Sequence, residues 1–139
     1  MAGYSGTPLA KKLGIKEGST VALLNPPATL DRELDLERLD GVTVRPQLKG
    51  PPLDVIVVFV KDRAELERRF PVAKRALHEK GGLWVAWPKR TSGVATDLTE
   101  NTVRDVGLAE GLVDTKVCAV DDTWSGLRFV YRLRDRPAR

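Results

Sequence analysis

Cysteine and histidine are nearly absent from this sequence of 139 residues, which holds one of each, Cys118 and His78. A single cysteine excludes an internal disulfide framework, and one of each residue leaves no conventional zinc ligand set. No apolar run approaches the roughly 20 residues of a membrane span, and none precedes a signal-peptide cleavage site. We therefore expect a cytoplasmic protein with no metal site and no membrane partner.

Charge is balanced over most of the chain. The first 127 residues hold eighteen basic and eighteen acidic residues, and the last twelve hold five arginines against one aspartate, which gives the net charge of +4. With 42% hydrophobic and 30% charged residues, the chain has a globular composition. We expect one α/β domain over residues 1–139, with a flexible arm at 1–5 and a basic tail at 134–139. Arginine-rich ends protect edge strands more often than they bind phosphate, so nucleic-acid binding through the arginines from Arg128 onward is the weaker alternative.

Strand and helix signals alternate along the sequence. Apolar runs predict strands at 20–24, 42–44, 55–60 and 83–87, followed by a hairpin of strands at 116–120 and 127–133. Caps and helical spacing predict helices at 8–13 after a cap at Thr7, at 30–39, and from Asp62 to Gly81. A last helix runs to about Ala109 from a cap at either Asp97, with Glu100, or Thr99. Pro71 lies within the third helix and predicts a kink or a division into two helices. This order predicts a three-layer Rossmann-like α/β sandwich, with a mostly parallel sheet of about six strands that ends in an antiparallel hairpin.

The run from Val55 to Val60, then a helix, then Gly81-Gly82 and the strand Leu83 to Trp87, resembles part of the class I methyltransferase fold. That resemblance implies a site for S-adenosylmethionine after the first strand, where the family has a glycine-rich turn. This chain has Asn25-Pro26-Pro27-Ala28 there, and proline removes amide donors and restricts the backbone. The family's acidic residue after the second strand is replaced by Arg45-Pro46. We therefore expect no cofactor, and keep S-adenosylmethionine or a nucleotide as the alternative.

Three further segments, at residues 4–14, 83–89 and 117–127, resemble an uncharacterised family of small bacterial proteins, domain of unknown function 3052. They span both ends of the chain. The family has no known activity, so this resemblance implies no function.

Ligands of open α/β sheets bind outside the carboxyl ends of the strands. Eight residues near those ends are our candidate ligand-binding set: Asn25, Asp62, Trp87, Lys89, Arg90, Ser92, Asp121 and Trp124. Each has a structural alternative: a rigid turn at Asn25, a solvated loop at 89–93, and a hairpin tryptophan folded back on the sheet. We assign no catalytic residue, because His78 is expected near a helix end far from this edge and Cys118 inside a strand.

Two functional hypotheses follow. The first is a non-catalytic binding or regulatory domain that recognises an unknown protein partner or a small anionic ligand. The second is a divergent methyltransferase-like or nucleotide-binding enzyme that uses the candidate set. A homodimer paired through the terminal hairpin stays open.

Overall fold

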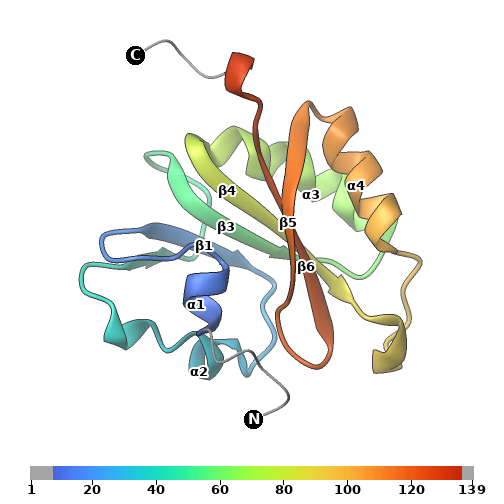
Figure 1. The fold of residues 1–139 in the computed structure, drawn as a ribbon, viewed down its shortest axis with the longest axis horizontal. Helices are drawn as coiled ribbons and strands as arrows, with labels where there is room; N and C mark the ends of the chain where they lie inside the picture. Colours follow the sequence, from blue (N-terminus) through green and yellow to red (C-terminus); the bar gives the residue numbers. More distant parts are fainter. Residues whose placement is uncertain (1–7, 136–139) are drawn as a thin grey trace.

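A computed structural model describes residues 8–135 and shows one six-stranded sheet in the order β2-β1-β3-β4-β6-β5 (Figure 1). The strands are β1 (Thr20–Leu24), β2 (Thr43–Arg45), β3 (Leu53–Phe59), β4 (Leu77–Pro88), β5 (Leu112–Ala119) and β6 (Trp124–Tyr131). β1 to β4 run parallel, and β6 is antiparallel to both β4 and β5. The predicted sheet with its terminal antiparallel hairpin is confirmed.

Two pairs of helices cover the two faces of the sheet. α1 (Leu9–Lys12) and α2 (Leu30–Leu34) contribute to one apolar cluster, which includes Trp84 and Trp124. α3 (Arg63–Ala76) and α4 (Glu100–Ala109) pack on the opposite face, in a second cluster that includes Trp87 and Phe129. Every residue of β3 from Val55 to Phe59 is buried, as expected of a central strand covered on both sides. The three-layer α/β architecture is confirmed.

The segment after β1 is less helical than predicted. A single helix was expected over 30–39, but α2 ends at Leu34 because Asp35 adopts a left-handed backbone with φ of 48°. A 3-10 turn, η1 (Leu36–Arg38), follows it. α2 is therefore only five residues long.

α3 begins as predicted and is not divided. Asp62 caps it, with Oδ1 accepting a hydrogen bond of 2.8 Å from the backbone N–H of Glu65. The helix continues through Pro71 to Ala76, so the expected division into two helices is wrong.

The sequence predicted the end of α3 too far along the chain, at Gly81 and not at Ala76. β4 starts at Leu77 and contains Gly81 and Gly82, which were expected to precede the strand. A Cβ on Gly81 would lie 2.7 Å from the carbonyl oxygen of Asp54, so neighbouring backbone requires glycine here. His78 accordingly lies in a strand and not in a helix. The predicted arm at 1–5, the Thr7 cap and tail residues 136–139 lie outside the described residues.

Candidate functional site

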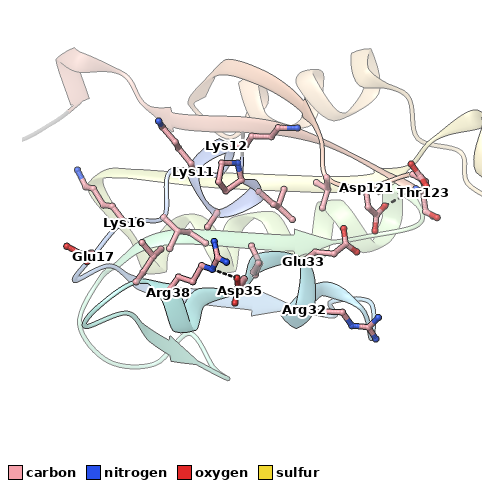
Figure 2. A pocket seen from close by; sticks show the side chains of 18 residues that line it. Lys11, Lys12, Lys16, Glu17, Arg32, Glu33, Asp35, Arg38, Asp121 and Thr123 are labelled. Atoms are coloured by element: carbon pink, nitrogen blue, oxygen red, sulfur yellow. Dashed lines mark hydrogen bonds and ion pairs between the residues drawn. The ribbon is translucent and has the colours of Figure 1, made fainter. Parts of the chain in front are cut away.

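A pocket of about 1440 Å³ opens between α1, the α2–η1 segment and the loop that joins β5 to β6 (Figure 2). Trp124 pairs with Pro88 at the end of β4, which places this loop at the carboxyl edge of the parallel strands. The residues lining the pocket are 8–12, 15–17, 32–35, 38–39 and 120–123. Ligand sites of open α/β sheets are found at this edge.

The two helices that border the pocket are short. α1 has four residues and α2 has five. Ile15, Leu34 and Val120 are buried in the cluster beneath them and supply apolar lining. An apolar floor with a few polar groups is typical of a small-molecule site.

One end of the pocket is acidic. Glu33 of α2 lies near Asp121 and Asp122 of the β5–β6 loop, and burial together with these two charges raises the pKa of Glu33 above its ordinary value. A hydrogen bond with the Thr29 side chain and the positive charge of Arg32 act in the opposite direction. The negative potential that disfavours ionised Glu33 favours a positively charged ligand group.

Asp121 also fixes the shape of its loop. Its Oδ1 accepts hydrogen bonds of 2.8 Å from the backbone N–H groups of both Thr123 and Trp124. The backbone N–H of Lys89 donates a 2.7 Å hydrogen bond to the carbonyl oxygen of Thr123 and ties the loop to the end of β4. Asp121 and Asp122 of the acidic end therefore lie in a loop that these hydrogen bonds hold in place.

The other end of the pocket is basic. Lys11, Lys12 and Lys16 line it from α1 and the turn that follows, and Figure 2 shows Lys16 and Asp121 at opposite ends. Arg38 also lines the pocket, but its Nε lies 2.9 Å from Asp35 Oδ2. Glu17 lies beside Lys16 at this end and Arg32 lies near Glu33 at the other, so each end has an excess of one sign that the opposite sign partly offsets.

Of the eight candidate residues from the sequence, only Asp121 lines this pocket. Trp124 is buried and meets Phe59 edge to face, with ring centroids 5.1 Å apart. Trp87 is 5% exposed and packs in the cluster on the α3–α4 side, so the expectation that it lines a cleft is wrong. Asp62 serves as the cap of α3.

The remaining candidates lie elsewhere along the same edge. Asn25 Nδ2 donates a long hydrogen bond of 3.5 Å to Glu65 Oε2. Ser92 Oγ donates to the carbonyl oxygen of Lys89 at 2.7 Å and accepts from the N–H of Val94 at 3.1 Å. Arg90 is exposed in the 3-10 turn η2 (Arg90–Ser92). Of these residues, Ser92 stabilises its own loop.

The turn after β1 compensates in part for its missing glycines. Asn25 has φ of 56°, the left-handed region that glycine adopts most readily. After β2, Arg45 Nη2 donates to the carbonyl oxygen of Pro51 at 2.6 Å, so the arginine there holds a loop. The turn after β1 thus has a left-handed residue, whereas the acidic residue after β2 is absent.

Neither a metal-binding group nor a membrane-spanning helix is found within residues 8–135. Between residues 8 and 135, no three histidine, cysteine, aspartate or glutamate side chains gather as a metal-binding group. No helix described there has the length and apolar character to cross a bilayer.

No family model matches the chain, and no curated protein matches it in sequence. Solved structures do match its fold. A putative type 11 methyltransferase from Sulfolobus solfataricus superposes with a TM-score of 0.60 and 14% identity, over 94% of this chain and 93% of that one. The chain has a methyltransferase-like Rossmann fold. The resemblance to domain of unknown function 3052 gains no support from these comparisons.

Two further matches were solved with S-adenosylmethionine bound. Magnesium protoporphyrin IX methyltransferase from Synechocystis PCC 6803 has a TM-score of 0.57 and 10% identity, over 89% of this chain and 74% of that one. Fibrillarin from Aeropyrum pernix has a TM-score of 0.53 and 14% identity, over 92% and 70%. At these identities the likeness shows the fold.

These neighbours correct two expectations from the sequence. The hypothesis of a non-catalytic binding or regulatory domain is contradicted, because the structures that share this methyltransferase-like fold include a series of methyltransferases. The expectation of no cofactor also loses its support, because neighbours were solved with S-adenosylmethionine or S-adenosylhomocysteine bound.

Proposed function

We propose that this protein is a divergent methyltransferase-like enzyme that binds S-adenosylmethionine in the pocket between α1, α2 and the β5–β6 loop. The observation that carries the proposal is the acidic end formed by Glu33, Asp121 and Asp122 at the carboxyl edge of a methyltransferase-like sheet. S-adenosylmethionine carries a permanent positive charge on sulfur, and its bound methyl group is the chemistry that it supplies.

The pocket fits such a ligand in size and charge. Its volume of about 1440 Å³ exceeds what an adenosyl nucleoside needs, so room is left for a second molecule. Glu33, Asp121 and Asp122 would face the sulfonium, and the apolar floor at Ile15 and Val120 would contact the uncharged parts of the ligand. The turn at Asn25 and the arginine at Arg45 depart from the family pattern, which is why we call the enzyme divergent.

A thermal-unfolding panel tests the proposal. The ligands are S-adenosylmethionine, S-adenosylhomocysteine and ATP, each at millimolar concentration. A ligand at a hundred times its dissociation constant adds about 2.7 kcal/mol to the free energy of unfolding, which raises Tm by several degrees for a domain of this size. We expect the largest rise with S-adenosylmethionine and a smaller one with the uncharged thioether, because only the sulfonium carries the positive charge that the acidic end attracts.

Two outcomes would contradict the proposal. A rise with ATP alone would favour the nucleotide-binding form of the alternative hypothesis. No rise with either adenosyl compound would remove the support for a methyl donor in this pocket.

A further inference from the structure

Backbone hydrogen bonds hold the two ends of the β5–β6 loop. The N–H groups of Val120 and Asp121 donate to the carbonyl oxygen of Trp124 at 2.9 and 3.3 Å, which closes the hairpin. The N–H of Lys89 donates to the carbonyl oxygen of Thr123 at 2.7 Å and joins the loop to the end of β4. None of these three bonds involves Asp122, the central residue of the loop.

The side chain of Asp121 connects the start of the loop to its end. Its Oδ1 accepts hydrogen bonds of 2.8 Å from the backbone N–H groups of both Thr123 and Trp124. Asparagine and aspartate often stabilise turns in this way, and an ionised acceptor makes the stronger bonds. Asp121 therefore sets the path that the backbone takes through Asp122.

The two neighbouring aspartates of this loop have different surroundings. Asp121 is half-buried and holds two N–H groups, whereas Asp122 is exposed to solvent. Both line the pocket, and both place a negative charge near Glu33. Removing the charge of Asp122 consequently leaves the bonds of the loop intact, whereas truncating Asp121 removes a charge and two hydrogen bonds together.

We propose that Asp121 is a positioning residue of the methyl-donor site, which holds Asp122 and Thr123 in the pocket wall near Glu33 of α2. Figure 2 shows Asp121, Thr123 and Glu33 at the same end of the pocket. The inference rests on the proposed function, because the ligand that would contact this wall is the adenosyl compound.

Shape and charge affect different ligands. A loop that has lost its internal hydrogen bonds samples several shapes, and the apparent affinity falls with the fraction of molecules in the binding-competent shape. That loss weakens the sulfonium compound and the thioether alike, because both contact the same wall. Loss of one negative charge weakens chiefly the sulfonium compound.

Three single substitutions separate the hydrogen bonds from the charge. Asp121→Ala removes both, Asp121→Asn removes the charge and keeps an oxygen acceptor, and Asp122→Asn removes an equal charge next to the loop bonds. Because backbone groups make the bonds at the loop ends, each variant should fold, and circular dichroism checks this. Calorimetry measures the affinities for S-adenosylmethionine and S-adenosylhomocysteine. Amide hydrogen exchange by NMR follows the N–H groups of Thr123 and Trp124 without ligand.

We expect Asp121→Asn and Asp122→Asn to lose part of the preference for the sulfonium compound and to bind the thioether as wild type does. Asp121→Ala should bind the thioether about tenfold more weakly, since hydrogen bonds to a charged acceptor change an equilibrium by about that factor or more. Amide exchange at Thr123 and Trp124 should accelerate in Asp121→Ala and stay slow in Asp121→Asn.

Wild-type affinity for the thioether in Asp121→Ala would overturn the inference and leave the proposed methyl-donor site intact. Equal weakening of thioether binding in Asp121→Asn and Asp121→Ala would also overturn it, because rescue by the retained oxygen would then be absent. Failure of wild type to bind either adenosyl compound would contradict the proposed function itself, and the inference with it.

Discussion

The indole Nε1 of Trp84 donates a hydrogen bond of 2.9 Å to the carbonyl oxygen of Leu13, across 71 positions of sequence. Trp84 is fully buried in β4, and Leu13 ends the short helix α1. Because α1 has only four residues, this bond and the apolar contacts below it fix one wall of the pocket. The position of the pocket therefore depends on a bond to the centre of the sheet.

Replacing Trp84 with phenylalanine should destabilise the protein. The change leaves the buried carbonyl of Leu13 without its donor, which costs about 1–3 kcal/mol, and the smaller ring loses packing as well. Urea unfolding measures the difference. Trp87→Phe is the control, because Trp87 is buried on the other face and its indole makes no hydrogen bond within residues 8–135. An equal loss in the free energy of unfolding in the two variants would show that the hydrogen bond from Trp84 to Leu13 contributes nothing to stability.

Adding one methyl group at Gly107 should also destabilise the fold. A Cβ there would lie 2.0 Å from Cε1 of Phe129, where α4 packs on β6. Alanine favours helix by up to about 1 kcal/mol over glycine. We expect overpacking of about 1–3 kcal/mol to outweigh that gain. Gly126→Ala is a graded comparison, since its Cβ would lie 3.2 Å from Trp84 Cε3 and should be tolerated better. A stabilised Gly107→Ala protein would contradict the packing described.

The acidic end should reduce stability at neutral pH. The raised pKa of Glu33 means that the folded state binds this proton more tightly than the unfolded state does. Stability therefore falls as pH rises from the ordinary glutamate value through the raised one, and the penalty is complete above it. We expect Glu33→Gln to be more stable than wild type at pH 7, with the difference shrinking towards pH 4. Unfolding at the two pH values measures this, and a less stable Glu33→Gln protein at pH 7 would contradict it.

The thiol of Cys118 should react slowly while the protein is folded. Burial raises its pKa, so less thiolate is present at pH 8 than in an unfolded chain. Alkylation by iodoacetamide, followed by mass spectrometry, should accelerate when the chain is unfolded in urea. Lys116→Gln removes one of the opposing charges and should slow the folded reaction further. A faster reaction in that variant would contradict the placement of Lys116 near the thiol.

The sequence predicted the elements whose signals are local. The apolar run of β3 and the Thr99 cap of α4 were found where expected, because each is decided by adjacent residues. Contacts remote in sequence decided the rest. Gly81 belongs to β4 because the backbone of Asp54 leaves no room for a side chain, and no local pattern reports that approach.

The pocket was harder to predict than the sheet. We expected ligand-binding residues at the strand ends and included Trp124 among them. In the structure Trp124 packs edge to face against Phe59. Neither Glu33 nor Lys16 belongs to a recognisable sequence motif. Both line the pocket only because α1, α2 and the β5–β6 loop meet in the folded protein.

The most direct test of the central claim is isothermal titration calorimetry with S-adenosylmethionine and S-adenosylhomocysteine at low salt, on wild type, Glu33→Gln and Glu37→Gln. Glu37 is exposed on the neighbouring 3-10 turn and does not line the pocket, which makes it the matched control. We predict that wild type and Glu37→Gln bind the sulfonium compound more tightly than the thioether, and that Glu33→Gln loses this preference. Equal affinity for the two compounds in wild type, or a preference that survives in Glu33→Gln, would contradict the assignment of the acidic end to a methyl donor.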